Sequence, residues 1–246
     1  MPHNNRPMTN PLIRRLERTG SLSDEEKQVL EGAIGRVKTF GPDEDIVRQG
    51  NRPTESTLIL EGFACRQKIL VDGQRQITAL HIPGDFADLH SYLLKKMDDG
   101  VVTLTPCKVA HVPHEALRRI VRGYPHLTEL LWFTTLVDAA IHREWMTGMG
   151  RRSSQGQMAH LLCELTLRLR TVGLVTDDSY QLPVTQQELG DALGLSIVHV
   201  NRTLQDLRGQ GLISWKGKTV EITDWEGLQQ LAEFDPTYLH LDHEGL

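Results

Sequence analysis

The chain has 246 residues, and its 27 Lys and Arg against 32 Asp and Glu give a formal net charge of −5 at pH 7. This length permits two modest domains, each able to bury a core. No apolar run approaches the roughly 20 residues of a membrane span, and no charged-then-apolar signal segment opens the chain. The three cysteines form neither a C-x-x-C pair nor a disulfide framework. The composition therefore predicts a cytoplasmic protein without a membrane partner and excludes the disulfide-rich secreted class.

The first half of the chain changes from helical to β-rich texture. Residues 1–20 read as a polar N-terminal arm with a short helix around Leu12 to Arg18, and Ser23 precedes an acidic triplet that suits the first turn of a helix. Between about residues 36 and 112, glycines separate five short β-rich runs, and Asp72–Gly73 is a hairpin turn. Regular turns of this kind predict an antiparallel roll or barrel, which we assign to a sensor domain over residues 21–125. The β-rich runs are Asp45–Arg48, Ser56–Leu60, Ala64–Val71, Gln76–His81 and Cys107–Val112.

A long helix is predicted from His126 to Met149, where proline is absent and the first glycine is Gly148. Apolar residues recur there at spacings of three and four, which predicts a dimerisation helix over residues 126–150 with a hinge at Gly148 and Gly150. The alternative is a long helix that packs on its own barrel. The predicted dimer seam consists of Leu127, Leu130, Leu131, Thr134, Val137, Asp138, Ile141 and Trp145.

The most informative segment, residues 182–208, has the pattern of two helices joined by a glycine turn. Thr185 and Glu188 form a capping-box pair for the first helix, and Gly194 supplies the turn. Ser196 caps a second helix, Ser196–Gly209. At about 100° per residue, its apolar side chains gather on one face and Arg202 points the opposite way. The predicted apolar face consists of Ile197, Val200, Leu204 and Leu207. An arginine in this position can bond guanine O6 and N7 in a DNA major groove.

A β-hairpin is predicted directly after the second helix. Residues 211–222 alternate apolar and polar side chains around Lys216-Gly217-Lys218, whose two lysines can meet DNA phosphates. A helix-turn-helix followed by such a hairpin is a winged helix, here within a domain of residues 151–235. Residues 221–246 carry seven acidic residues and no Lys or Arg, and we assign residues 236–246 to an acidic tail. The bulk charge does not favour DNA binding, which must depend on locally placed cations and on a dimer.

These features together resemble the Crp/Fnr family of transcription regulators over roughly residues 20–235. The residues that carry the resemblance are Gly41–Gly50 at the entry to the roll, Ile82-Pro-Gly-Asp-Phe86, Val184–Gly190 and Val200-Asn-Arg202. The resemblance implies an α+β fold: an N-terminal antiparallel β-roll, jelly-roll-like, a long dimerisation helix and a C-terminal winged helix-turn-helix. It further implies a homodimer that reads a palindromic operator in double-stranded DNA and recruits RNA polymerase.

The predicted DNA-binding side chains lie on the two helices and the wing. They are Thr185, Gln186, Ser196, Val198, His199, Asn201, Arg202, Lys216 and Lys218. Many relatives carry a Glu one turn before the Arg, where it accepts from cytosine N4. Val198 occupies that place in this chain, and valine can only touch a thymine methyl. We therefore expect a different base preference at this position.

The predicted effector pocket departs from relatives that bind cyclic AMP. Its residues are Asp85, Phe86, Asp88 and His90. Those relatives carry a Glu and then an Arg that neutralises the cyclic phosphate. Asp88 can replace the Glu, but Met97-Asp98-Asp99 stands where the Arg should be. The pocket should therefore repel a phosphate, and the effector stays unidentified.

The histidines and cysteines suggest no cofactor or metal. No cysteine precedes Cys65, which argues against the N-terminal iron–sulfur centre of oxygen-sensing relatives. His111 and His114 have ligand-like spacing, but Pro113 breaks any helix between them. Because haem-sensing relatives exist, one histidine as an axial haem ligand stays an open alternative. The alternative function is a small cupin-type β-barrel enzyme that depends on a metal. It requires closely spaced His and carboxylate motifs, which the sequence lacks, so we expect a regulator and not an enzyme.

Overall fold

The computed structural model describes residues 10–241, so residues 1–9 of the predicted arm and residues 242–246 of the predicted tail lie outside the described residues. Two short helices open the described part of the chain. α1 (Pro11–Leu16) begins after Asn10, whose side chain accepts from the Leu12 amide. α2 (Asp24–Gly32) begins with a capping box in which the Ser23 and Glu26 side chains each accept from the other's backbone N–H. Both starts are explained by side chains within three residues of the cap.

An antiparallel β-roll follows, built from two sheets. One sheet has the strand order β1-β7-β3 and the other has the order β2-β6-β4-β5. The strands are β1 (Arg36–Phe40), β2 (Asp45–Val47), β3 (Glu55–Glu61), β4 (Ala64–Ile69), β5 (Arg75–His81), β6 (Gly100–Thr103) and β7 (Cys107–Pro113), with the short helix α3 (Ser91–Leu94) before β6. The five predicted β-rich runs became β2, β3, β4, β5 and β7. β1 was not predicted because four of its five residues are exposed, and β6 was not predicted because it is only four residues long and wholly buried.

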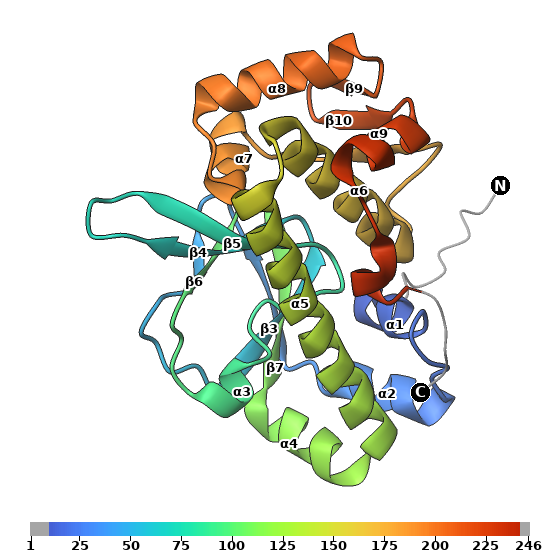
Figure 1. Cartoon of the computed structure of the whole chain (residues 1–246). Helices are drawn as coiled ribbons and strands as arrows, with labels where there is room; N and C mark the ends of the chain where they lie inside the picture. Colours follow the sequence, from blue (N-terminus) through green and yellow to red (C-terminus); the bar gives the residue numbers. More distant parts are fainter. Residues whose placement is uncertain (1–9, 242–246) are drawn as a thin grey trace, which may run out of the picture.

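Three helices connect the roll to the C-terminal part. They are α4 (His114–Gly123), the diagonal helix α5 (Pro125–Arg151) and α6 (Ser154–Thr171) (Figure 1). The predicted hinge is displaced, because α5 continues through Gly148 and Gly150. The helix ends at Arg151, the backbone becomes extended at Arg152, and Ser153 caps α6.

The C-terminal part is a winged helix. It contains β8 (Ser179–Gln181), α7 (Gln186–Leu193), α8 (Ile197–Gly209), β9 (Ile213–Lys216), β10 (Thr219–Ile222), α9 (Trp225–Ala232) and a 3-10 turn, η1 (Pro236–Leu239). The three strands form a sheet in the order β8-β10-β9. This part lies at the upper end of the molecule, and η1 returns to pack against α5 (Figure 1).

One apolar core joins the roll to the winged helix. It includes Ile77 of β5, Ile141 of α5, Leu161 of α6, Leu189 of α7 and Leu204 of α8, all buried. A shared core restricts relative motion of the two parts more than a polar interface would. Among the described residues, no helix combines the length and the apolar character needed to cross a bilayer.

Candidate DNA-binding surface and sensor interior

The helix-turn-helix is fixed by caps and by two glycines. Thr185 Oγ1 accepts from the Glu188 amide at 3.1 Å, and Glu188 Oε2 accepts from the Thr185 amide at 2.6 Å. Gly194 ends α7 with a φ of 68°, a left-handed conformation that suits glycine. A Cβ at Gly190 would lie 2.5 Å from the Leu195 carbonyl oxygen. The turn therefore requires glycine at both positions.

Helix α8 is buried on one face and exposed on the other. Ser196 caps it by accepting from the His199 amide at 3.3 Å. The predicted apolar face is correct for Val200, Leu204 and Leu207, which are buried. It is wrong for Ile197, which is 49% exposed because it is the first helical residue after the turn.

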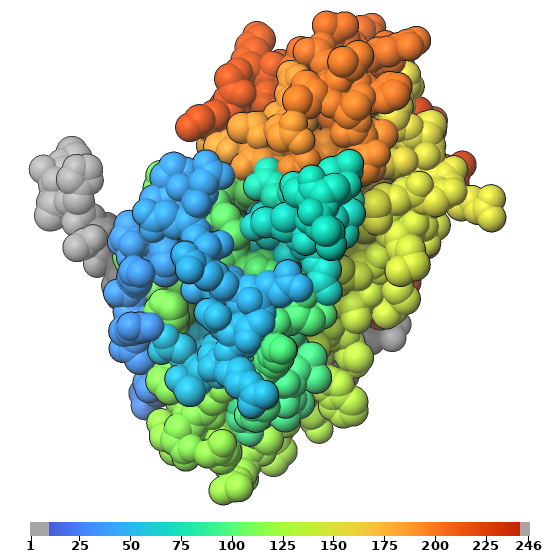
Figure 2. Space-filling view, turned by 90° about the vertical axis from the view of Figure 1, so that its left-hand side faces the viewer, coloured from blue at the N-terminus to red at the C-terminus, as the bar shows by residue number. Residues whose placement is uncertain are grey.

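The exposed face of α8 carries the predicted DNA-binding side chains. Val198 is 77% exposed, and Arg202 is also exposed. His199 Nδ1 lies 3.1 Å from Ser196 Oγ, and Asn201 donates to Gln186 Oε1 at 3.3 Å. These two contacts hold polar side chains of the surface in place. The winged helix forms the top of the molecule in Figure 2, above the β4–β5 hairpin.

The wing presents two lysines at its tip. Lys216 and Lys218 are exposed on either side of Gly217, which has a φ of 59°. The tip joins β9 to β10, and β8 pairs with β10 on the other side. The three strands thus support a basic loop next to α8, a position from which lysines can reach phosphates.

The predicted dimer seam is buried in the chain's own core, which corrects the prediction. Leu127 and Leu130 are fully buried in a cluster with α1 and α4, and Leu131 lies in the same cluster. Val137, Ile141 and Trp145 are buried in the core that joins roll and winged helix. These six side chains are covered by the same chain and cannot line a seam between two copies.

The two polar residues of the predicted seam also have partners within the chain. Thr134 donates its hydroxyl to the Leu131 carbonyl at 2.8 Å. Asp138 accepts from Arg66 of β4 at 2.7 Å. Although burial opposes its ionisation, the Arg66 guanidinium holds the pKa of Asp138 below its usual value.

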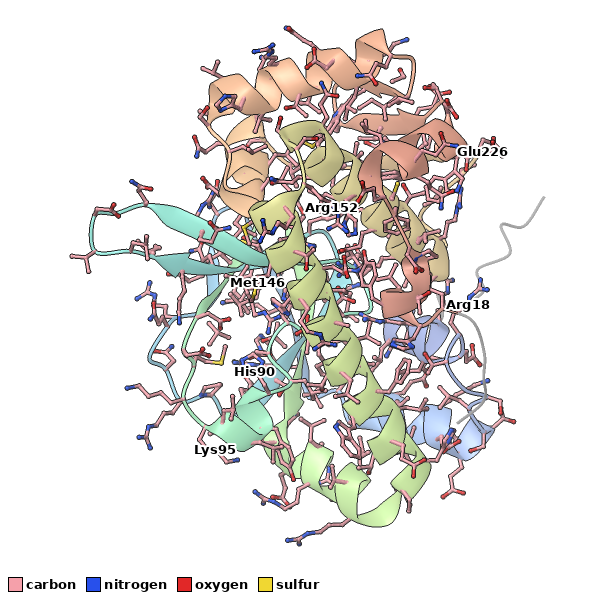
Figure 3. The ribbon with its side chains drawn as sticks, viewed as in Figure 1. Arg18, His90, Lys95, Met146, Arg152 and Glu226 are labelled. Atoms are coloured by element: carbon pink, nitrogen blue, oxygen red, sulfur yellow. The ribbon has the colours of Figure 1, made fainter. Side chains whose placement is uncertain are left out.

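The opposite face of α5 is exposed and mostly apolar. Trp132 is 66% exposed and Leu136 is 53% exposed. Ala139, Arg143 and Met146 continue the same stripe at spacings of three and four, and Met146 is labelled in Figure 3. We call Trp132, Leu136, Ala139, Arg143 and Met146 the α5 stripe.

In the predicted sensor domain, Asp85 makes structural ion pairs. Its carboxylate accepts from Arg168 at 2.7 Å and pairs with Arg15 of α1. Arg168 also donates to Glu164 at 2.9 Å and to the Leu80 carbonyl at 2.8 Å. Asp85 therefore ties the roll to α1 and α6, and it also borders the cleft beside α5, so its role as a ligand-binding group stays a prediction.

Asp88 is buried away from the other predicted pocket residues. Its Oδ1 accepts from the Thr57 amide of β3, and its Oδ2 has no partner. Burial raises the pKa of Asp88 to about 6. The prediction that Asp88 lines the pocket with Asp85, Phe86 and His90 is wrong, because only the other three border the cleft.

The cleft lies between the roll and α5, where His90 is labelled in Figure 3. Its charged centre is Arg66, a residue that was not predicted from the sequence. Arg66 donates to Asp138, contacts His142 Nε2 at 3.0 Å and lies 3.9 Å from Asp99. The only sequence signal was a charged residue at an inward position of a β-strand. Asp99 and Asp138 already neutralise this cation, so it is not free for a phosphate.

One group of side chains has the ligand types of a metal site. Ligand atoms of His90, Asp98 and Asp99 lie within 4.8 Å of one another. Imidazole and carboxylates suit divalent metals, but Arg66 already supplies a positive charge beside Asp99. His111 and His114 have separate partners, since His111 lies 3.3 Å from Glu55 and His114 lies 3.1 Å from Ser91.

Comparison with known proteins identifies both parts of the chain. A cyclic nucleotide-binding domain family matches residues 37–124, and a Crp-like helix-turn-helix domain family matches residues 156–231. The transcriptional activator protein FnrL of Cereibacter sphaeroides is 27% identical over 216 residues, 86% of each chain. The nitrogen fixation regulation protein FixK of Bradyrhizobium diazoefficiens is 29% identical over 201 residues, 81% of this chain and 83% of FixK.

A solved structure shows the same fold. The structure of FixK2 from Bradyrhizobium japonicum matches with a TM-score of 0.74 and 24% identity, covering 80% of this chain and 97% of that one. The predicted roll, long helix and winged helix are thus confirmed. The chain belongs to the Crp/Fnr family of transcription regulators, with a helix-turn-helix DNA-binding domain.

Proposed function

We propose that this protein is a homodimeric regulator that reads a palindromic operator through α8. The observation that carries the proposal is the exposed face of α8, where Arg202 stands on a capped helix with its opposite face buried. Arginine on such a helix can make the bidentate contact to guanine. We assign the flanking readout to Val198 and His199, and phosphate contacts to Thr185, Gln186, Lys216 and Lys218.

The α5 stripe is our candidate for the dimer interface. Its large apolar side chains are exposed along one face, and seam residues at three-and-four spacing match a pair of parallel helices. Joining two copies there would present two α8 helices to half-sites about one DNA turn apart, ~34 Å centre to centre. Two linked sets of contacts also compensate for the net charge of −5.

The sensor should respond to something other than a cyclic nucleotide. Asp98 and Asp99 stand where a phosphate needs a cation, and Arg66 is engaged with Asp99 and Asp138. The relatives named as transcriptional activators support recruitment of RNA polymerase in the cytoplasm. We propose no enzymatic activity and no required cofactor.

Selection of bound sequences from random duplex DNA tests the proposal. The full chain should enrich an inverted repeat whose half-sites share a guanine and lie about one helical turn apart. The selection should be performed with protein purified aerobically and anaerobically, since oxygen-dependent enrichment would reveal a redox effector. Failure of both preparations to enrich any sequence would overturn the proposal.

A further inference from the structure

The tip of α8 is apolar where the helix would enter the major groove. Ile197 and Val198 occupy its first two positions and are 49% and 77% exposed. Among the residues that the structure describes, none fully covers either side chain, whereas the neighbouring Val200 is fully buried. The exposed apolar surface of these two adjacent β-branched side chains gains no free energy of burial in the free protein. Because they lie on the recognition helix of a DNA-binding domain, we expect DNA bases to cover them.

The polar side chains beside this tip already have partners. His199 is held by Ser196 Oγ at 3.1 Å, and Asn201 donates to Gln186 across the two helices. Arg202 is exposed one turn beyond Val198. The rise between Val198 and Arg202 is about 6 Å, or roughly two base steps. The apolar tip and Arg202 can therefore face neighbouring base pairs of one half-site.

The major groove contains one apolar group, the 5-methyl group of a pyrimidine. Valine and isoleucine are stiff at χ1, so packing them against a methyl costs little side-chain entropy. We propose that Ile197 and Val198 recognise 5-methylpyrimidines beside the guanine read by Arg202: thymine in ordinary DNA, and 5-methylcytosine where cytosine is methylated. The inference rests on the proposed DNA-binding function and makes binding sensitive to cytosine methylation.

Removing single methyl groups from DNA and protein tests the inference. Each thymine of the selected half-site is replaced in turn by deoxyuridine, which keeps the base pair and loses the methyl. For the full chain, deoxyuridine at the contacted position should weaken binding about fourfold per half-site, which corresponds to ~0.8 kcal/mol. Cytosine placed at that position should bind about fourfold more tightly when it carries a 5-methyl group.

A mutant cycle identifies the protein side of the contact. In Val198→Ala and Ile197→Ala, deoxyuridine should cost less than twofold, because the partner methyl groups are gone. Both residues are exposed, so the variants should fold. Val121→Ala, which removes the same two methyls as Val198→Ala but from an exposed site on α4, should retain the full deoxyuridine penalty.

The outcomes separate the two proposals. A chain that selects no sequence overturns both the DNA-binding function and this inference. A chain that selects an operator but binds deoxyuridine as tightly as thymine at every position overturns the inference alone. The inference also fails alone if Val198→Ala and Ile197→Ala both keep the penalty, because the methyl is then read by other residues.

Discussion

Arg202 and Asp88 show how differently a charged side chain behaves in solvent and in the core. Arg202 is exposed on α8, where a polar ligand can approach it. Asp88 is completely buried and has one unpartnered carboxylate oxygen. Arg202 stays solvated in the fold and is available for recognition. Burial destabilises the charged form of Asp88, so the stability of the fold should depend on pH.

Arg202→Ala should weaken operator binding by about 1–3 kcal/mol per half-site and relax the preference at one base pair, because bidentate guanine contacts have this value. Fluorescence anisotropy with operators altered at each position measures both effects. Arg122→Ala, at an exposed site on α4, is the control for loss of charge. Unchanged affinity and selectivity in Arg202→Ala would show that α8 docks in another orientation.

Asp88→Asn should stabilise the fold at alkaline pH. The pKa of Asp88 is raised to about 6 by burial, above its unfolded value, so the folded state binds the proton more tightly. Its contribution to stability therefore falls as pH rises from about 4 to 6 and stays low above that. Urea unfolding should show Asp88→Asn more stable than the wild type by about 1–3 kcal/mol at pH 8, with the gain lost near pH 4.

The matched control for this experiment is Asp98→Asn, which neutralises an exposed carboxylate on the adjacent loop. It should change stability little at either pH. A pH-independent difference between Asp88→Asn and the wild type would contradict the assignment of the buried proton to Asp88.

At the scale of elements, α5 has apolar side chains on two faces with different roles. One face completes the core of the chain, and the α5 stripe faces solvent. The loop between α3 and β6 carries Asp98 and Asp99 where a cation was expected, and β4 supplies Arg66 to pair with Asp99. The α5 stripe and the loop before β6 can therefore each be tested by experiment.

Leu136→Asp and Ile141→Asp should have different effects. Leu136 lies on the α5 stripe, so a charge there should dissociate the dimer in sedimentation experiments while circular dichroism stays native. Ile141 is buried in the chain's own core, so its replacement should cost about 3–5 kcal/mol and unfold much of the protein. A folded, dimeric Leu136→Asp variant at low micromolar concentration would place the interface elsewhere.

Cyclic AMP should not bind. A buried phosphate without a free cation is unfavourable, and Arg66 is already paired with Asp99 and Asp138. Asp98 and Asp99 add negative charge at the expected position of the phosphate. Isothermal calorimetry at millimolar nucleotide should record no saturable heat. Micromolar binding that also changes operator affinity would refute this interpretation of the loop.

At the scale of the whole molecule, the roll and the winged helix are joined in several places. They share an apolar core, and Arg75 of β5 donates to Asp191 of α7 at 2.7 Å. Gln76 donates to the Ala192 carbonyl at 3.4 Å beside this pair. Figure 2 shows the winged helix resting on this part of the roll. The roll thus contacts α7, the helix that precedes α8, so a change in the roll would reach the DNA-binding surface directly.

A charge swap tests this contact. Arg75→Asp should weaken operator binding about tenfold, because two facing carboxylates displace α7 and misalign two half-site contacts. Adding Asp191→Arg should recover most of the affinity by restoring the ion pair in reverse. Arg48→Asp, which breaks an exposed ion pair with Asp45 on β2, is the control and should have little effect. A double variant as weak as Arg75→Asp would show that the pair does not orient α7.

The sequence by itself determined the features that act within one or two turns of chain. The Thr185–Glu188 cap, the Gly194 turn and the buried face of α8 depend on residues at most a few positions apart. The glycine-separated runs likewise predicted most strands of the roll. The family resemblance supplied the order of the parts and the place of Arg202.

Tertiary structure decided what depends on contacts between distant residues. Both faces of α5 are apolar, so periodicity could not tell the face that packs on the roll from the face left exposed. Arg66 reaches Asp138 across 72 residues, and Asp88 meets Thr57 across 31. Pairings of this kind leave no periodic signal, because burial and charge compensation are settled only when separate elements pack together.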